Sequence, residues 1–256
     1  MEGRLTLSNR LPLSLLAVRM KHRVGTVSLD VEFALTKPWT VLFGPSGSGK
    51  TTVLRAIAGF VQPEEAVIAR GAEVLVDRKA RIFLPAYKRP VRSAGQTARL
   101  FPQMTVRENV AYGVGWNSKP EEARELVDEV LRLFRLGAAT QSLPGELSGG
   151  EQQKVSMARA VASAVTTGRS DGAFLLLDEP FAGLDMRVRD ELAAELKEWL
   201  GERKTPVLSV THDVSEAFLL DAEVIKLRDG RVVQQGPVSE VLHEERQRLI
   251  GHLGAG

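Results

Sequence analysis

Eight consecutive residues have the spacing of a phosphate-binding loop. They read Gly44-Pro45-Ser46-Gly47-Ser48-Gly49-Lys50-Thr51, which matches the pattern G-x-x-x-x-G-K-[ST]. Glycines let successive backbone N–H groups point inward at phosphate oxygens, and the following helix adds the partial positive charge of its N-terminus. We therefore predict a bound nucleoside triphosphate, with Lys50 at the β- and γ-phosphates and Thr51 on Mg²⁺. A glycine-rich turn that binds nothing is the less favoured alternative.

Two carboxylates form a second candidate group. Asp178 and Glu179 follow the apolar run Phe174 to Leu177, and ligands of open α/β sheets gather at the carboxyl ends of strands. Asp178 is placed to orient Mg²⁺, directly or through water. Glu179 could polarise the water that attacks the γ-phosphate. Ordinary surface carboxylates at a strand end are the alternative, and the phosphate loop makes it less favoured.

A second glycine-bearing helix start lies further along the chain. Ser148 can cap this helix, and Glu151 three residues later would complete a capping box. Gly149 and Gly150 leave backbone amides uncovered at a positive helix end, which predicts a second anion site. A plain helix cap explains the same residues equally well.

His212 ends another apolar run and is predicted at the same sheet edge as Glu179. An imidazole there could hydrogen-bond the γ-phosphate, although a lone histidine at a strand end is more often structural. The other three histidines have no ligand spacing with it and cysteine is absent, so we predict no metal site made by the protein alone.

The elements that hold these residues can be read from the apolar periodicity. Antiparallel strands are predicted between Leu13 and Phe33, with a break at Gly25. The helix after the phosphate loop is predicted over Thr51 to Ala58, ending at Gly59. Further strands are expected between Val67 and Leu84.

The middle of the chain changes to a helical pattern, from about Thr97 to Thr167. Within it, Ser118, Pro120 and Glu121 predict the start of an amphipathic helix. Its apolar positions recur at three- and four-residue spacing, and they are Ala123, Leu126, Val127, Val130, Leu131 and Phe134.

After Gly168 the α/β pattern returns. Ala173 to Leu177 and Val207 to Val210 are continuous apolar runs, typical of strands buried on both faces. The helix between them is predicted over Met186 to Leu200, ending at Gly201. The sequence thus predicts a parallel α/β core over residues 1–96 and 168–256, with an antiparallel β subdomain and a helical subdomain over residues 97–167 inserted between its two parts.

Composition narrows the function classes. The 256 residues contain 34 basic and 32 acidic side chains, a net charge of +2 that is too small to favour nucleic acid. No apolar run approaches the roughly 20 residues of a membrane helix. The absence of cysteine excludes disulfides and favours a cytosolic location.

Six motifs in register resemble those of ATP-binding-cassette (ABC) ATPases. In chain order they are similar to the Walker A, Q-loop, signature, Walker B, D-loop and H-loop motifs, and they lie at Gly44 to Thr51, Gln96, Leu147 to Gln153, Leu175 to Glu179, Ala182 to Asp185, and His212. The resemblance implies a P-loop NTPase core of the RecA-like kind, and it covers nearly the whole chain.

The same resemblance implies a homodimer that holds ATP between two copies. Phosphate-loop residues of one copy and the signature residues of the other would contact the nucleotide, and the implied set is Gly44, Pro45, Ser46, Gly47, Ser48, Gly49, Lys50, Thr51, Thr52, Asp178, Ser148, Gly149, Gly150 and Glu151. Glu179 would be the general base and His212 a γ-phosphate contact. Thr51, Gln96 and Asp178 would hold Mg²⁺, with Gln96 also linking the attacking water to the helical lobe. Asp185 would contact the opposite subunit.

Residues 84–110 are similar to the importer subfamily that serves solute-binding proteins, and Ala98-Arg99-Leu100-Phe101-Pro102 most resembles molybdate or tungstate importer subunits. Sulfate, ferric-iron, polyamine and sugar importers remain alternatives, as does an ATPase switch acting on DNA or ribosomes. The resemblance implies membrane permease subunits, an indirect link to a solute-binding protein, and a place at the cytoplasmic face of the membrane. Phe101, Pro102 and Met104 would face the permease or pack inside the lobe.

Three features depart from the family pattern. The family often stacks an aromatic residue on adenine just before the position of Gly25, where this chain has His22, Arg23 and Val24. Ser93-Ala94-Gly95 replaces the usual apolar strand before Gln96, so we expect a shorter strand. Molybdate-type subunits often carry a further β-rich regulatory domain, and we expect none within these 256 residues.

Overall fold

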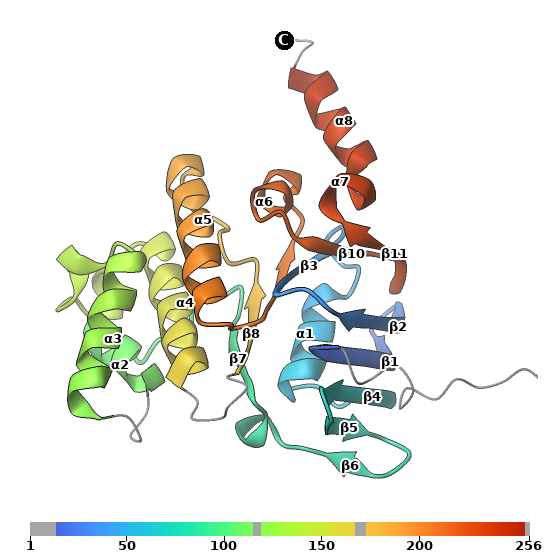
Figure 1. The fold of residues 1–256 in the computed structure, drawn as a ribbon, viewed down its shortest axis with the longest axis horizontal. Helices are drawn as coiled ribbons and strands as arrows, with labels where there is room; N and C mark the ends of the chain where they lie inside the picture. The colour runs from blue at the N-terminus through green and yellow to red at the C-terminus, as the bar shows by residue number, and fades with distance from the viewer. Residues whose placement is uncertain (1–13, 115–118, 167–172, 254–256) are drawn as a thin grey trace, which may run out of the picture. The chain divides into compact units, whose positions relative to one another are not determined.

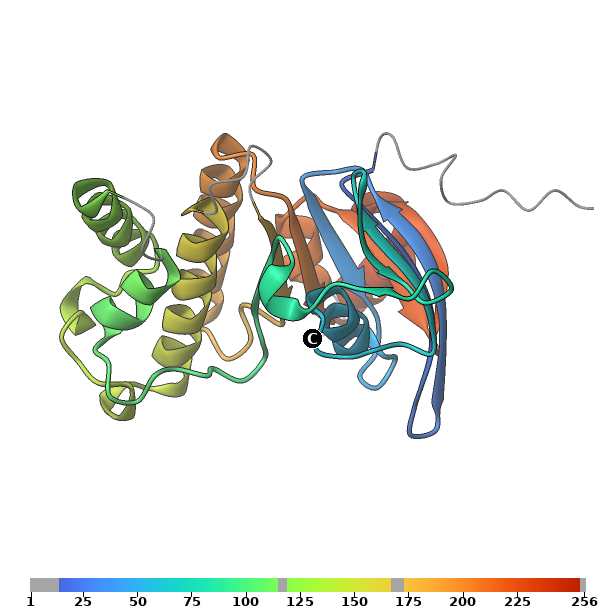
Figure 2. The same cartoon turned by 90° about the horizontal axis from the view of Figure 1, so that it is seen from below.

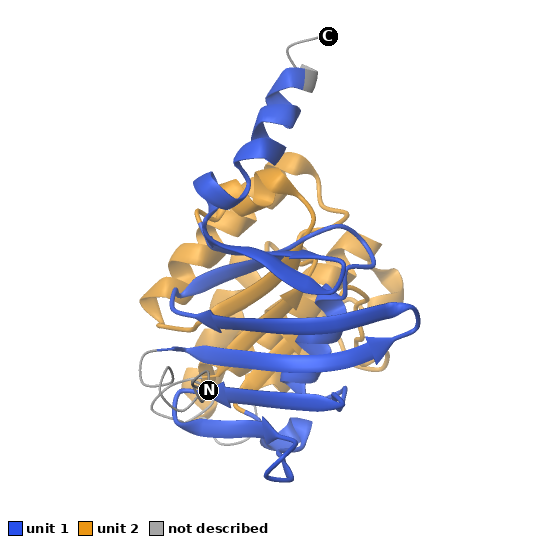
Figure 3. Cartoon of the chain, turned by 90° about the vertical axis from the view of Figure 1, so that its right-hand side faces the viewer, with its two compact units in different colours: residues 1–89, 222–256 blue, residues 90–221 orange. Residues whose placement is uncertain are grey.

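A computed structural model describes residues 14–114, 119–166 and 173–253. The chain divides into two compact units, residues 1–89 with 222–256 and residues 90–221 (Figure 3). None of the helices in the described part of the chain is long and apolar enough to cross a membrane.

Strands dominate the first unit. In its described residues they follow the order β6-β5-β4-β1-β2-β11-β10-β3. Their bounds are β1 (Leu16–Val24), β2 (Val27–Leu35), β3 (Trp39–Phe43), β4 (Glu65–Arg70), β5 (Glu73–Asp77), β6 (Ile82–Phe83), β10 (Glu223–Arg228) and β11 (Arg231–Pro237). β1 and β2 form an antiparallel hairpin that turns at Gly25, whereas β3 and β10 pair in parallel. The strands predicted on both sides of Gly25 and between residues 67 and 84 are therefore confirmed.

Helix α1 follows the phosphate loop in this unit. It spans Lys50–Ala58, one residue longer at its start than predicted, and Gly59 is its C-cap as expected. Its buried face includes Val53, Ala56 and Ile57, each 0% exposed, and Figure 1 shows the helix beside the strands of the unit. The remaining helical segments of the unit are η3 (Ala86–Lys88), α7 (Val238–Val241) and α8 (His243–Leu253).

Three parallel strands organise the second unit. They are β7 (Val91–Ala94), β8 (Phe174–Asp178) and β9 (Val207–Thr211), and β8 pairs with both neighbours. Every residue of β8 and β9 is buried, which confirms the two apolar runs as interior parallel strands. β7 has only four residues, in agreement with the short strand expected before Gln96.

Helix α5 (Met186–Glu202) connects β8 to β9, and its predicted end at Gly201 was wrong. The helix continues through Gly201 to Glu202, with Arg203 at the C-cap. Glycine ends a helix when it occupies the residue after the last turn in a left-handed conformation. Here Lys204 takes that conformation instead, with φ +50°. The N–H groups of Lys204 and Thr205 donate to the carbonyls of Gly201 and Leu200, both at 3.0 Å, so Gly201 stays within the last turn.

The remaining helices of the second unit are α2 (Val106–Val114), α3 (Pro120–Leu133), α4 (Gly149–Thr166) and α6 (Val214–Leu219), with short 3₁₀ turns η4 (Gly137–Ala139) and η5 (Pro144–Glu146). Figure 2 shows α2, α3 and α4 side by side. The amphipathic helix is confirmed as α3, with Val127, Val130 and Phe134 buried.

Several sequence expectations concern the limits of the helical segment. Ser118, the predicted cap of α3, and Thr167 and Gly168 at the end of the segment lie outside the described residues. The helix begins at Pro120 with Lys119 at its N-cap position. The second compact unit, residues 90–221, contains β7, β8 and β9 as well as the helices. The predicted boundaries of the helical subdomain at residues 97 and 167 therefore stay a prediction.

Candidate functional site

The phosphate loop joins the end of β3 to the start of α1, as predicted. Two of its glycines are required by their surroundings. Gly49 has φ +100°, and a Cβ there would overlap the Leu29 side chain. A Cβ at Gly44 would overlap the carbonyl oxygen of Leu227. The loop backbone therefore lies too close to neighbouring strands for any larger residue at these two positions.

Lys50 is folded across this loop. Its Nζ atom donates hydrogen bonds to the carbonyl oxygens of Gly44 and Pro45, both at 2.8 Å, and the residue is only 6% exposed. Ser48 is 4% exposed, and its Oγ atom has no hydrogen-bond partner among the described residues. A buried ammonium beside an unsatisfied buried hydroxyl is a donor set suited to phosphate oxygens.

The other loop residues are accessible to a ligand. Pro45, Ser46 and Gly47 are exposed, and Thr51 and Thr52 are partly exposed in the first turn of α1. The role of Thr51 in holding Mg²⁺ with the phosphates stays a prediction. The predicted loop residues thus lie together, within the first unit.

In the second unit, Gln96, Glu179 and His212 lie together. The His212 Nδ1 atom is 3.0 Å from Glu179 Oε1, and Gln96 Nε2 donates to Glu179 Oε2 at 3.2 Å. Both oxygens of one carboxylate thus have partners from segments more than 30 residues away. The carboxylate is held in one orientation, as a general base needs to be.

Glu179 owes its position to an unusual backbone conformation. It has φ +49°, in the left-handed region that non-glycine residues rarely adopt. Its N–H donates to the Val210 carbonyl at 2.9 Å, which extends the pairing of β8 with β9 by one residue. Asp178, the last residue of β8, is 6% exposed. The two adjacent carboxylates therefore differ in environment, with Asp178 in the strand and Glu179 turned out of it.

The predicted capping box at the start of α4 is confirmed. Ser148 donates to Glu151 Oε2 through its N–H at 2.9 Å and its hydroxyl at 2.6 Å, and Glu151 N–H donates to Ser148 Oγ at 3.3 Å. The hydrogen bonds from Ser148 hold the pKa of Glu151 below its ordinary value. Gly149 and Gly150 are the first residues of the helix. The anion site proposed there stays a prediction, because a cap alone accounts for these bonds.

Sequence reasoning missed a link between this helix and the glutamine motif. Gln153 on α4 donates from Nε2 to the Gly95 carbonyl at 3.2 Å, and Gly95 directly precedes Gln96. It also missed Arg189 and Glu216, which lie close to the residues flanking His212. The spacing of Asp213 and Glu216, an acid and a glutamate three residues apart, is a capping-box signal that could have revealed Glu216.

The segment from Phe101 to Met104 is anchored from within the unit. The Phe101 ring packs on Tyr112 with centroids 4.5 Å apart, and the Arg159 guanidinium lies 5.0 Å from it. Asn109, fully buried, bonds the backbone of Phe101 and Met104. Pro102 remains exposed, so Phe101 serves internal packing and Pro102 is the accessible tip.

A pocket of about 560 Å³ opens in the first unit near the turn between β1 and β2. Its lining includes His22, Glu64, Asp229, Arg231 and Leu29, the residue that packs against Gly49. The described lining residues include no phenylalanine, tyrosine or tryptophan.

The strand, phosphate loop and helix of the first unit place the chain among P-loop α/β proteins that bind nucleotides. Comparison with known proteins narrows this class. The family profile described as ABC transporter matches residues 27–182, and the chain belongs to this family. Its fold class, predicted from the motifs, is thereby confirmed.

Relatives and solved structures agree with this assignment. The chain is 38% identical over 225 residues to the molybdenum import ATP-binding protein ModC of Mesorhizobium japonicum, covering 88% of this chain and 59% of the relative. It is 35% identical over 238 residues to the spermidine/putrescine import ATP-binding protein PotA of Vibrio cholerae, covering 91% of this chain and 59% of the relative. The chain thus spans about three fifths of the length of these curated relatives.

Among solved structures, the dimeric ATP-binding cassette MJ0796 matches with a TM-score of 0.71 and 25% identity, over 87% of this chain and 98% of the other. A second structure of that cassette, in a post-hydrolysis state with ADP and Pi, matches with a TM-score of 0.69 and 24% identity over the same shares.

Proposed function

We propose that this chain is the ATP-hydrolysing subunit of an ABC importer, which pairs with a second copy on binding ATP and drives uptake of a small solute. The observation that carries the proposal is the Glu179 carboxylate held by His212 and Gln96 in a chain that also contains a complete phosphate loop. A fixed carboxylate and a phosphate cradle are the two requirements for water to attack a γ-phosphate.

In the proposed reaction, Glu179 accepts a proton from the attacking water as the water oxygen bonds to the γ-phosphorus. The bond from the γ-phosphorus to the oxygen bridging the β- and γ-phosphates breaks in line, and ADP leaves with the electron pair. Lys50 stabilises charge on the phosphates, and His212 contacts the γ-phosphate. Mg²⁺ bound with ATP would supply further neutralisation, and Thr51, Asp178 and Gln96 are the residues that would hold it.

The second copy completes the site in this proposal. Ser148, Gly149, Gly150 and Glu151 of one copy would meet the nucleotide held by the other. Dimeric cassette structures with the same fold support such pairing. Because contacts to both copies exist only in the closed pair, ATP would shift the population toward the dimer.

The solute proposed is an oxyanion such as molybdate, since several molybdenum import proteins are 35–38% identical to this chain. A polyamine is the second candidate, because a spermidine/putrescine import protein matches at 35% identity. We further propose that integral membrane permease subunits bind the chain at the cytoplasmic face of the membrane, near Pro102, and link it indirectly to a solute-binding protein. No nucleic acid partner is proposed.

Hydrolysis and pairing can be tested on the purified chain. Glu179→Gln should retain ATP binding, lose phosphate release by about 100-fold or more, and accumulate as a dimer with ATP and Mg²⁺ in size-exclusion chromatography with light scattering. Lys50→Ala should instead weaken ATP binding. Glu198→Gln, an exposed glutamate on α5, is the matched control. A Glu179→Gln variant that hydrolyses ATP normally would contradict the role proposed for this carboxylate.

The solute can be tested by co-purifying the membrane protein that binds the chain and reconstituting both in vesicles. Stimulation of ATP hydrolysis by molybdate with its binding protein supports the oxyanion, and stimulation by spermidine supports the polyamine. Binding to DNA or RNA that survives physiological salt would favour the nucleic-acid switch instead.

A further inference from the structure

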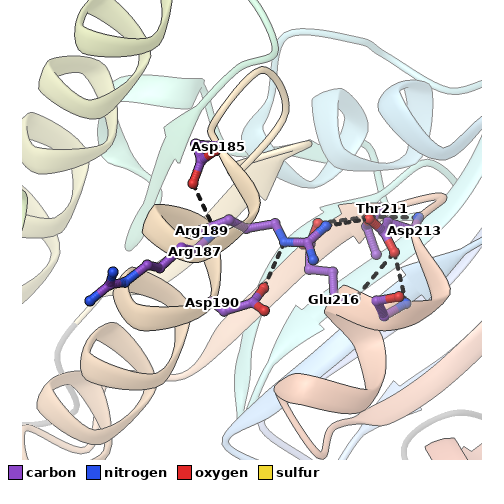
Figure 4. A network of polar contacts seen from close by, with 8 residues as sticks. Asp185, Arg187, Arg189, Asp190, Thr211, Asp213 and Glu216 are labelled. Carbon is purple, nitrogen blue, oxygen red and sulfur yellow. Dashed lines mark hydrogen bonds and ion pairs between the residues drawn. The ribbon is translucent and has the colours of Figure 1, made fainter.

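A cluster of charged residues contacts the two neighbours of His212 in the sequence, Thr211 and Asp213 (Figure 4). Arg189, on the first turns of α5, donates from its NH1 nitrogen to Asp213 Oδ2 at 2.6 Å. Its Nε atom donates to Asp190 Oδ1 at 2.8 Å. Asp213 is the residue after His212 and the N-cap of α6. The guanidinium therefore joins α5 to the segment that carries the histidine.

The Arg189 ion pair differs from the surface pairs of the same helix. Its side chain is 15% exposed, whereas the side chain of Arg187, two residues earlier, is 87% exposed and pairs with Glu191. Burial alone would lower the pKa of Arg189, but the hydrogen bond to Asp190 and the charges of Asp213, Asp190 and Glu216 raise it above its ordinary value. The Asp213 and Asp190 side chains are more exposed, at 38% and 45%. The guanidinium is therefore the largely buried member of the pair, and its charge depends on these two carboxylates for compensation.

Asp213 and Thr211 fix the backbone on both sides of His212. Asp213 Oδ1 accepts from the N–H groups of Ser215 at 2.7 Å and Glu216 at 3.3 Å. The Asp213 N–H donates to Thr211 Oγ1 at 3.0 Å, and that hydroxyl donates to Glu216 Oε2 at 2.9 Å. The His212 side chain is itself 58% exposed. Its direction is therefore restrained by the contact with Glu179 and by the backbone that its two neighbours fix, rather than by packing of its own.

A single helical turn connects the same arginine to Asp185. The Arg189 N–H donates to the Asp185 carbonyl at 2.8 Å, and Asp185 Oδ1 accepts from Arg187 N–H at 3.0 Å as the N-cap of α5. A displacement of Asp185 would therefore act on the backbone of Arg189, because this helical hydrogen bond joins the two residues directly.

We propose that Arg189 is a positioning residue for His212, acting through Asp213, and that it couples the start of α5 at Asp185 to the direction of the imidazole. The inference rests on the proposed function, in which Asp185 faces the second copy and His212 contacts the γ-phosphate. Arrival of the second copy at Asp185 would then be transmitted to the histidine through one helical turn and the ion pair between Arg189 and Asp213.

The test compares Arg189→Met with Arg187→Met in the purified full chain. Misplacing a reacting group by about 1 Å costs on the order of 100-fold in rate. We expect Arg189→Met to lower kcat for ATP hydrolysis at least tenfold with KM for ATP within about twofold of wild type, because the phosphate loop is unchanged. Arg187→Met should leave both constants unchanged.

Asp213→Asn adds a variant that spares the fold, since asparagine caps helices as well as aspartate does while carrying no charge. It should lower kcat by a similar factor, and the double variant should be no worse than Arg189→Met alone, since both changes remove the ion pair between Arg189 and Asp213. Equal kcat values for Arg189→Met, Asp213→Asn and wild type would overturn the proposal, and so would independent, multiplicative losses.

A second measurement does not depend on hydrolysis. The imidazole proton resonances of His212, assigned by comparison with His212→Gln, should shift in Arg189→Met and Asp213→Asn and stay in place in Arg187→Met. Unchanged resonances would overturn the proposal even in an inactive preparation. A wild-type chain without ATPase activity that shows these shifts would refute the proposed function and retain the positioning role of Arg189.

Discussion

Replacing Glu216 with glutamine should change how the stability of the protein depends on pH. Glu216 is 4% exposed on α6, and among the described residues its Oε1 atom has no hydrogen-bond partner. Burial, together with the negative charges of Asp213 and Glu179, raises its pKa to about 7, although the hydrogen bond from Thr211 and the charge of Arg189 oppose the rise. The folded protein therefore holds a proton on this carboxyl where an exposed glutamate would have lost it.

The sign and size of the effect follow from linkage. The pKa rises from 4.5 when the carboxyl is exposed in the unfolded chain to about 7 in the folded protein. Between these values the folded state binds the extra proton, so the free energy of unfolding falls as pH rises through this window. The contribution is fully present below pH 4.5 and is lost above pH 7. At about 1.4 kcal/mol for each pKa unit, the loss amounts to about 3 kcal/mol.

Glutamine has nearly the same shape as protonated glutamate and does not titrate. Relative to wild type, Glu216→Gln should therefore gain up to about 3 kcal/mol in free energy of unfolding between pH 4.5 and pH 8. Urea unfolding followed by tryptophan fluorescence at several pH values measures this difference, and Trp199 in the second unit reports on it. Glu198→Gln, an exposed change on α5, is the control and should follow the wild-type curve.

The refuting result is a constant difference between Glu216→Gln and wild type across this pH range. It would mean that Glu216 titrates equally in the folded and unfolded chains, and that the buried, half-satisfied carboxyl does not hold a proton near neutral pH.

Two further predictions concern the first unit. Arg89 is 1% exposed and donates to the carbonyls of Leu84, Ala56 and Ile57, each at 2.7 Å, and burial lowers its pKa to about 10. Arg89→Met should lower the free energy of unfolding by about 3 kcal/mol, since it leaves buried carbonyls at the end of α1 without donors. Lys88 is exposed, and Lys88→Met is the control. Equal denaturation midpoints for the two variants would contradict the capping role of Arg89. Gly49→Ala should abolish nucleotide binding in calorimetry, because φ +100° and overlap with Leu29 both oppose a Cβ. Gly145→Ala, where the added Cβ meets nothing within 4 Å, should bind as wild type, and retained affinity in Gly49→Ala would show that the loop tolerates the larger residue.

Much of the fold followed from local patterns. The strands at β8 and β9 were predictable because a short run of apolar residues without polar alternation is typical of a strand buried on both faces. The end of α1 was predictable from Gly59, which takes a left-handed conformation there. The end of α5 was not, because Gly201 stays helical and Lys204, which is not a glycine, takes the left-handed conformation that ends the helix. A glycine marks the end of a helix only where its own backbone takes the left-handed conformation, as Gly59 does and Gly201 does not.

The candidate site also has a part that the local sequence predicts and a part that it does not. The phosphate loop, the capping box at Ser148 and the carboxylates after β8 are contiguous in the chain, so their spacing predicted them. The bonds from Gln96 and His212 to Glu179 join residues 83 and 33 positions apart. The apolar runs predicted His212 at the same sheet edge as Glu179, and the family resemblance implied roles for Gln96 and His212 at the nucleotide. Neither bond follows from the spacing alone.

The sequence by itself determined the chemistry available to this protein, because a phosphate loop and a capping box depend on the backbone of a few consecutive residues. Only the tertiary structure decided which side chains restrain that chemistry. Arg189, Asp213 and Glu216 look like ordinary surface charges in the sequence, and burial at the junction of α5, α6 and β9 brings them together. Their electrostatic importance arises from desolvation, which is a property of the packed molecule and of no local pattern.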